Sequence, residues 1–430
     1  MTASFWQKVK TDPVYRQGLI FMIGNFTAAV MGYLYHLFMG RMLTPSEYAI
    51  VASLLSLFII ISVPANTIQT VVMRYTAQYQ AQRNIQGINW LERFLGLRMF
   101  WAGCVVAAVF LALSPWISRF LNIGSVYPVA IVGLVFIFSF LSPVYRGILQ
   151  GLQKFKDVCW SLIGEALVKL GAAVALVWLG FQAGGAVAAV VLGVVAGLLI
   201  AWQLTKRRER VAGEQPTRIK ELFAYTVPVV ITLLILALLY NIDVILVKHY
   251  FPGDEAGHYA ALSQLGKIIV FGTGAIAGVM FPMVVEKFEK KQNYAPVLWK
   301  SIGIVGLLSG IATVVYFLAP KFIIGLLYGP EYLALSDLLG YVAIFMTLYA
   351  VLNILIQFFI SIKSYRFLIW LGLGIVAQVL LIIFYHRTIS QVIIVMDLSL
   401  AAITALLFIY YAIFRKKLGA RQTVDSGSGL

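Results

Sequence analysis

Residues 239–267 read LYNIDVILVKHYFPGDEAGHYAALSQLGK, and this stretch decides the fold. It places an acidic residue, Asp243, inside a run of apolar residues that suits the interior of a lipid bilayer. A charged side chain in hydrocarbon costs about 2.5–3.5 kcal/mol on insertion scales, so such residues face the interior of a helix bundle or a water-filled path. The stretch therefore predicts a membrane protein whose helices enclose polar groups.

The composition of the whole chain supports the same class. The chain has 430 residues, of which 61% are hydrophobic and 12% are charged, and its mean hydropathy is +0.91. Continuous apolar runs of about 20 residues recur, as membrane-spanning α-helices require, whereas the strands of a membrane β-barrel alternate every second residue. We therefore predict an all-α polytopic membrane protein. The first apolar run is too long for a cleavable signal, so we expect it to be retained.

Twelve spans are predicted from these runs. Most of the 33 lysines and arginines lie in alternate connections, which places both termini in the cytoplasm by the positive-inside rule. The net charge of +16 is thus explained by topology, and we expect no nucleic-acid partner. The predicted spans are 17–40, 48–73, 99–117, 127–149, 158–179, 184–204, 226–250, 258–281, 298–318, 335–361, 367–385 and 390–414.

The chain also contains an internal repeat. A shift of 208 positions pairs residues 43–47 with 251–255. A shift of 205 positions pairs five residues of 115–134 with identical residues of 320–339. Each half has six spans, an even number, so both halves enter the membrane from the same side and the repeat is parallel. We expect a pseudo-twofold axis along the membrane normal and a central cavity between two lobes.

The repeat sets the predicted domain boundaries. The N-terminal six-helix lobe covers 1–204, a basic cytoplasmic linker covers 205–225, and the C-terminal six-helix lobe covers 226–415. The tail 416–430 contains Ser-Gly-Ser-Gly and is predicted to be disordered. Because the expected cavity lies within one chain, we expect a monomer.

Charged residues within the spans are the first candidates for a functional site. Glu165 and Lys169 are four residues apart and share one helix face, so they form either a self-neutralising structural pair or part of a site. Lys267 has no acid at helical spacing in its own span, so Asp243 is its candidate partner, and such a pair would pin spans seven and eight together.

The alternative is that these groups serve a ligand. Lys169 and Lys267, one from each half, would face the axial cavity, with Arg74 and Arg146 at its cytoplasmic end. Such a cationic cavity suits an anion. Smaller polar groups that bridge helices more often than they bind substrate are also cavity candidates, namely Asn25, His36, Asn241 and Gln264.

The sequence contains no motif for catalysis. The four histidines are scattered, and the two cysteines, Cys104 and Cys159, lie in or beside apolar runs. We expect no disulfide, no metal site and no cofactor, and we do not expect an enzyme. Coupling of transport to a proton or sodium gradient through Asp243 or Glu165 is a further hypothesis.

Four short patterns in the sequence are informative together. They are GRMLTPSEY at 40–48, RGILQG at 146–151, NID at 241–243 with GHYAA at 257–261, and LYGPEY at 327–332. These patterns resemble those of the polysaccharide-biosynthesis and lipid-linked-oligosaccharide flippases of the multidrug/oligosaccharidyl-lipid/polysaccharide (MOP) exporter superfamily. The similarity covers about residues 15–415.

The resemblance implies a function. It implies a two-lobed, alternating-access transporter that moves a polyprenyl-diphosphate-linked saccharide from the cytoplasmic to the outer leaflet of the cell membrane, with basic residues in its central cavity. Its partners would be this lipid-linked substrate, membrane lipids and polysaccharide-assembly proteins. Two alternatives stay open: an ion-coupled exporter of organic cations from the same superfamily, and a non-transporting scaffold in a polysaccharide-assembly complex.

Overall fold

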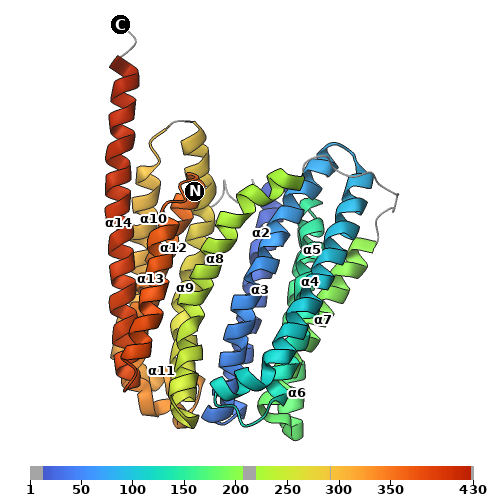
Figure 1. Ribbon diagram of the computed structural model, residues 1–430, viewed down its shortest axis with the longest axis vertical. Helices are drawn as coiled ribbons and strands as arrows, with labels where there is room; N and C mark the ends of the chain where they lie inside the picture. The colour runs from blue at the N-terminus through green and yellow to red at the C-terminus, as the bar shows by residue number, and fades with distance from the viewer. Residues whose placement is uncertain (1–12, 207–218, 291, 428–430) are drawn as a thin grey trace. The chain divides into compact units, whose positions relative to one another are not determined.

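The computed structural model describes residues 13–206, 219–290 and 292–427 (Figure 1). Every regular element in these ranges is helical. The elements in chain order are α2 (Pro13–Met42), α3 (Pro45–Ala81), α4 (Ile85–Phe120), α5 (Tyr127–Gly151), α6 (Phe155–Leu176), η1 (Val177–Phe181), α7 (Gln182–Lys206), α8 (Ile219–Tyr250), α9 (Gly253–Glu289), α10 (Ala295–Leu318), α11 (Pro320–Leu327), η2 (Pro330–Leu338), α12 (Leu339–Ser361), α13 (Phe367–Phe384) and α14 (Ile389–Gly427).

Eleven stretches of the described chain are long and apolar enough to cross a membrane. One of them, Phe155–Lys206, is folded as two helices, α6 and α7, which pack along each other. Each of the twelve predicted spans therefore falls on a helix, and the all-α polytopic class is confirmed. The helix α14 continues as far as Gly427, past the boundary predicted at 415.

The turn between α6 and α7 has an unusual backbone. Gly180 has a φ of 90° and Gln182 a φ of 48°, both in the left-handed region that glycine adopts most readily. The backbone N–H of Ala183, in the first turn of α7, donates to Glu47 Oε2 at 2.8 Å. A carboxylate at a helix N-terminus satisfies a free N–H and interacts favourably with the helix dipole. A residue at the start of α3 thus caps α7.

Several helices extend well beyond the predicted spans. The helix α4 starts at Ile85, although its apolar run starts at 99, because Asn84 Oδ1 accepts the backbone N–H of Gly87 at 2.7 Å and caps the helix there. Similarly, Thr44 caps α3 by accepting the N–H of Glu47, and Pro45 occupies the first helical turn. Hydropathy reports the part of a helix that contacts lipid, whereas capping residues mark its true ends.

The chain forms two compact units, and they are described separately. Unit 1 comprises Met1–Ala237 and Phe251–Ala260, and unit 2 comprises Leu238–Tyr250 and Ala261–Leu430. The lobe boundaries at 204 and 226 stay a prediction, and most of the predicted linker 205–225 lies outside the described residues.

In unit 1, α5 is the central helix, because it packs on α3, α4 and α7. Its contact with α3 is close at Gly147 and Gly151, where an added Cβ would come within 2.7 Å of Gln69 O and 2.6 Å of Met73 O. Small residues at such positions let membrane helices approach. In unit 2, α12 packs on α10 and α14, and α13 packs on α14.

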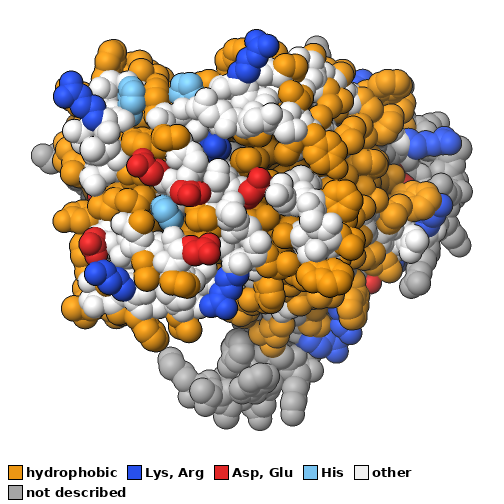
Figure 2. Space-filling model, turned by 90° about the horizontal axis from the view of Figure 1, so that it is seen from below, with side chains coloured by type: hydrophobic (Ala, Val, Ile, Leu, Met, Phe, Trp, Pro, Cys, Tyr) orange, Lys and Arg blue, Asp and Glu red, His pale blue; other side chains and the backbone are white. Residues whose placement is uncertain are grey.

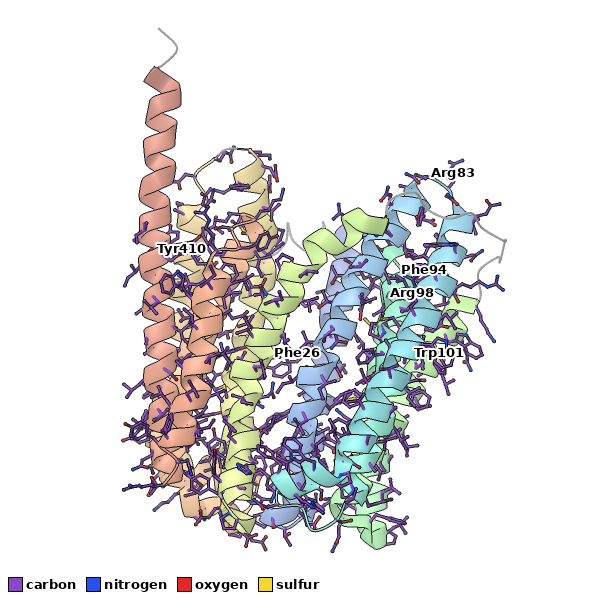
Figure 3. All side chains as sticks on the ribbon, viewed as in Figure 1. Phe26, Arg83, Phe94, Arg98, Trp101 and Tyr410 are labelled. Carbon is purple, nitrogen blue, oxygen red and sulfur yellow. The ribbon has the colours of Figure 1, made fainter. Side chains whose placement is uncertain are left out.

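Large apolar side chains cover the outside of the helices. Trp178 and Leu318 are both 80% exposed, which suits contact with lipid rather than water. Seen from one end, acidic and histidine side chains are visible among other polar and hydrophobic ones (Figure 2). On α4 the guanidinium of Arg98 lies 3.8 Å from the ring centroid of Phe94 (Figure 3), which is a cation–π contact.

Candidate functional site

A partly buried ion pair joins α5 to α6 in unit 1. The guanidinium of Arg146 donates from Nη2 to Glu165 Oε2 at 2.5 Å and from Nε to Ser161 Oγ at 2.9 Å. The side chains of Arg146 and Glu165 are only 11% and 27% exposed. Ser161 Oγ in turn donates to the carbonyl of Gly197 in α7 at 2.8 Å. The network thus ties three helices together through one arginine.

Two glycines of α7 make room for this network. An added Cβ on Gly197 would lie 2.6 Å from Arg146 Nη2 and 2.8 Å from Glu165 Oε2. One turn along, an added Cβ on Gly193 would lie 2.7 Å from Lys169 Cβ and 2.8 Å from Glu165 O. The spacing of four residues on α7 matches the spacing of Glu165 and Lys169 on α6, so the two helices meet with small residues opposite charged ones.

Lys169 is held differently from Arg146. Its Nζ lies 5.0 Å from the ring centroid of Tyr35, in a cation–π arrangement, and the hydroxyl of Tyr35 donates to Ala186 O at 2.9 Å. One of the two readings of the sequence paired Lys169 with Glu165, but the carboxylate of Glu165 binds Arg146. Within the part of the chain that the structure describes, Lys169 forms no ion pair, so its positive charge is not neutralised by direct contact.

A second cluster lies in unit 2 between α8 and α9. Lys267 is 7% exposed, and its Nζ donates to Asn241 Oδ1 at 3.0 Å and lies 4.7 Å from the ring centroid of Tyr240. Asp243 is fully buried and accepts a hydrogen bond from Ser263 Oγ at 3.0 Å. Two hydrogen bonds, Lys267–Asn241 and Ser263–Asp243, therefore join α8 to α9. The sequence had offered Asp243 as the candidate partner of Lys267, but the direct partner is Asn241.

Asp243 still influences Lys267, because the two charges interact electrostatically without a direct hydrogen bond between them. The ring of Tyr240 packs on Tyr349 of α12, with centroids 5.0 Å apart. The ammonium group of Lys267 thus lies over the ring of Tyr240, as that of Lys169 lies over the ring of Tyr35. Both units present the same arrangement: a lysine over a tyrosine ring inside the spans.

The remaining predicted residues are Arg74, Asn25, His36 and Gln264, of which His36 contacts the Lys169 cluster through the ring of Tyr35. Arg74 is exposed on α3, and Asn25 is exposed on α2, where its Nδ2 donates to Phe21 O of its own helix at 3.0 Å. The ring of His36 lies between two tyrosine rings, and its Nδ1 is 3.3 Å from the hydroxyl of Tyr48. Gln264 is half-buried on α9 beside Ser263.

Sequence reasoning missed the residues that support the lysines and the arginine. Ser161 and Ser263 accept or donate within the clusters, and Tyr35 and Tyr240 lie beneath the ammonium groups. Tyr240 could have been found, because it precedes Asn241 and lies in the stretch that also contains Lys267. Ser161 is four residues before Glu165 and shares its helix face, which was the available signal.

Both clusters combine cations, amide and hydroxyl groups, and aromatic rings. Within the described ranges, no group of three or more His, Cys, Asp or Glu side chains could hold a metal ion. A lysine on an aromatic ring keeps its ammonium fixed while leaving hydrogen-bond donors for an anionic ligand.

Comparison with solved structures identifies the fold. An inward-facing multidrug-resistance MATE-family transporter of the MOP superfamily matches with a TM-score of 0.74 and 15% identity, covering 90% of this chain and 96% of that one. The lipid II flippase MurJ in an inward-closed conformation matches with a TM-score of 0.69 and 13% identity over 92% and 87% of the two chains. A MOP-superfamily transporter from Pyrococcus furiosus, described as having a binding pocket of reverse polarity, matches with a TM-score of 0.67 and 16% identity over 94% and 95%.

No curated protein sequence matches the chain. A family model described as "Polysaccharide biosynthesis protein" matches residues 14–288, which is well over half of the chain. The resemblance stated from the sequence is thereby confirmed, and the fold is that of transporters rather than of enzymes. The chain belongs to the polysaccharide biosynthesis protein family and has the fold of the transporters of the MOP superfamily.

Proposed function

We propose that this protein is a flippase that moves a polyprenyl-diphosphate-linked saccharide from the cytoplasmic to the outer leaflet of the cell membrane by alternating access. The observation that carries the proposal is the pair of lysines inside the spans. Lys169 and Lys267 each lie over a tyrosine ring, and neither forms an ion pair among the described residues. The family match and the similarity to a lipid II flippase support the same class of cargo.

The charge balance supports an anionic ligand. In unit 1, Arg146 and Glu165 neutralise each other, which leaves the charge of Lys169 in excess. In unit 2, the charge of Lys267 is offset by Asp243 at longer range, while its direct partner is the neutral Asn241. The two clusters together therefore carry a net positive charge.

The physical need for such a site is clear. A diphosphate sugar cannot cross hydrocarbon unaided, because desolvating an isolated ion costs tens of kcal/mol by Born estimates. A hydrated cationic path removes most of that barrier, and the lipid tail stays in the bilayer. With a negative cell interior, outward movement of each negative charge is favoured by about 2.3 kcal/mol per 100 mV. Under this proposal both termini are cytoplasmic and one chain suffices for transport.

A proteoliposome assay tests the proposal. Purified protein is reconstituted with a fluorescent polyprenyl-diphosphate oligosaccharide, and its appearance on the far leaflet is measured for wild type and for Lys169→Ala/Lys267→Ala. We expect wild-type transport and at least tenfold slower transport by the variant. The matched control is Lys290→Ala/Lys363→Ala, which removes two lysines that form exposed ion pairs with Glu286 and Glu289, and it should transport normally.

A second candidate is an ion-coupled exporter of organic cations. Two observations favour it: the similarity in fold to a multidrug-resistance transporter, and Asp397 of α14, whose buried Oδ1 has no hydrogen-bond partner among the described residues. A partly buried, unsatisfied carboxylate within a span is a candidate for cation or proton binding. Wild-type vesicles that fail to move the lipid-linked saccharide but expel an organic cation, with loss of efflux in Asp397→Asn, would select this function instead.

A further inference from the structure

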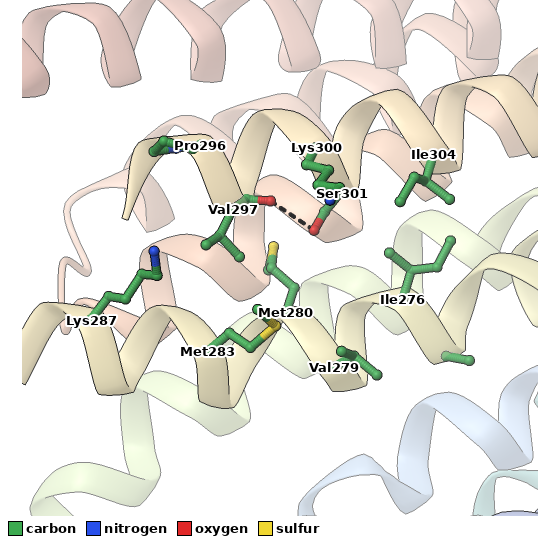
Figure 4. Close-up of a pocket in the computed structure, with 11 residues that line it drawn as sticks. Ile276, Val279, Met280, Met283, Lys287, Pro296, Val297, Lys300, Ser301 and Ile304 are labelled. Carbon is green, nitrogen blue, oxygen red and sulfur yellow. Dashed lines mark hydrogen bonds between the residues drawn. The ribbon is translucent and has the colours of Figure 1, made fainter. Parts of the chain in front are cut away.

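An apolar groove lies between α9 and α10, entirely within unit 2. Its volume is about 580 Å³, within the range of roughly 300–1,000 Å³ of ligand pockets. We call it the α9–α10 groove. Its apolar walls are formed by Ile276, Val279, Met280, Met283, Val297 and Ile304, and two lysines, Lys287 and Lys300, complete it (Figure 4).

Lys287 lies at one end of the α9–α10 groove, on α9. Lys300 lies on the facing wall from α10, nearer the middle, and Ile276 and Ile304 lie at the other end (Figure 4). From Lys287 to Ile276 the groove follows α9 for 11 residues, which is about 16 Å of helix. Half of a bilayer's hydrocarbon core is about 15 Å thick. The groove therefore has the length of one leaflet's acyl chains, with Lys287 at one end and Lys300 further along the opposite wall.

Neighbouring acids do not neutralise these two lysines by direct contact. Glu286 binds Lys290 at 2.6 Å, and Glu289 binds Lys363 at 3.1 Å. Among the described residues, Lys287 and Lys300 form neither a hydrogen bond nor an ion pair. Both carboxylates are thus already paired with other lysines, so Lys287 and Lys300 keep their positive charge.

We propose that the α9–α10 groove binds one anionic phospholipid of the membrane, with its phosphate between Lys287 and Lys300 and an acyl chain along Ile276–Met283 of α9. Basic pockets between membrane helices on the cytoplasmic side bind anionic lipid headgroups, and the predicted topology places both lysines on that side. The occupant is a resident lipid rather than transported cargo, because the groove is complete within one unit and its length matches a single leaflet. The proposal does not depend on what the protein transports.

The experiment measures retained lipid by native mass spectrometry. Full-length protein is delipidated in detergent and titrated with phosphatidylglycerol or with phosphatidylcholine of the same acyl chains. Wild type should retain one phosphatidylglycerol more tightly than phosphatidylcholine, and added salt should reduce this preference. In Lys287→Ala/Lys300→Ala the affinity for phosphatidylglycerol should fall about 10- to 30-fold.

Two further variants make the test specific. Lys290→Ala/Lys363→Ala removes the same charge from ion-paired positions nearby and should leave the lipid preference unchanged. Val279→Trp narrows the apolar wall at an exposed position and should weaken retention of both lipids without altering charge. A monodisperse gel-filtration profile establishes that each variant is folded.

Three results would overturn the proposal. The first is equal retention of phosphatidylglycerol and phosphatidylcholine by wild type, which would show that the charge of the lipid headgroup does not affect binding. The second is an equal loss of phosphatidylglycerol in the Lys287/Lys300 variant and in the paired-lysine control. The third is displacement of phosphatidylglycerol by a short polyprenyl diphosphate in wild type but not in the Lys287/Lys300 variant, which would assign the groove to transported cargo.

Discussion

The backbone N–H of Ser46 donates to Asp254 Oδ1 at 3.0 Å, and the two residues are 208 positions apart, which is the offset of the internal repeat. Equivalent positions of the two copies therefore touch each other. Asp254 belongs to the first turn of α9, and Ser46 to the first turn of α3. One carboxylate thus lies at the N-terminal ends of two helices, where negative charge is stabilised.

The contact between Ser46 and Asp254 can be locked covalently. In a Cys104→Ser/Cys159→Ser background, we expect oxidation of Ser46→Cys/Asp254→Cys to form a cross-link. If transport requires the starts of α3 and α9 to separate, the cross-linked protein should stop transporting in the proteoliposome assay and recover with reductant. Each single cysteine variant, oxidised in the same way, should keep its activity. Full transport by the cross-linked protein would contradict alternating access at this end.

Removal of one partner of the Arg146–Glu165 pair should destabilise unit 1. Glu165→Met leaves a buried guanidinium without its carboxylate, and breaking such a pair costs about 3–5 kcal/mol. The double variant Arg146→Met/Glu165→Met leaves no charge and should recover most of that loss. Thermal unfolding in detergent measures both. A double variant as unstable as Glu165→Met would show that packing, and not charge, dominates at this site.

Close contact between α6 and α7 should make Gly193 sensitive to a single methyl group. In Gly193→Ala the new Cβ would be 2.8 Å from Glu165 O, a backbone atom, so the helices must separate. We expect a loss of about 1–3 kcal/mol in stability. Gly171→Ala on α6 is the control, because nothing lies within 4 Å of its added Cβ. It should be neutral or slightly stabilising, since alanine favours helix.

Asp243 and Glu165, the two acids within the spans near the lysines, allow a test of ion coupling. Asp243→Asn/Glu165→Gln keeps hydrogen-bonding capacity at both positions and removes two negative charges near the lysines. If either acid carries a coupling ion, transport should lose its dependence on the proton or sodium gradient while substrate binding becomes tighter. Initial rates with and without an imposed gradient measure this. An unchanged rate and an unchanged ion dependence would exclude both acids from coupling.

The fold was largely predictable from the sequence, for a physical reason. Hydrocarbon forces every span to be a continuous apolar helix, so the runs reveal the helices directly. The ends of the helices were harder to predict from hydropathy. The helix α4 begins at Ile85, 14 residues before its apolar run, because that part is amphipathic and is defined by the Asn84 cap rather than by lipid. The Asn84 cap can be recognised in the sequence when the helix is not assumed to begin where the apolar run begins.

The candidate site was predicted only in part. Spacing along one helix placed Glu165 beside Lys169, but Arg146 of α5 takes the carboxylate, and only the packing of α5 on α6 and α7 reveals that. Asp243 was likewise the obvious partner of Lys267, yet the lysine donates to Asn241. Pairwise charge matching along the sequence does not include the neutral serines, tyrosines and amides that share these clusters.

The cap that Glu47 provides for α7 bears on the biogenesis of the protein. Chains are synthesised from the N-terminus, so the hairpin of α2 and α3 enters the bilayer before α7 exists. The N–H of Ala183 therefore finds its acceptor already in place when the sixth span inserts. A chain lacking Glu47 would have to insert α7 with an unsatisfied backbone N–H at its N-terminus. The hairpin of α2 and α3 thus provides, before α7 inserts, the acceptor that caps this helix.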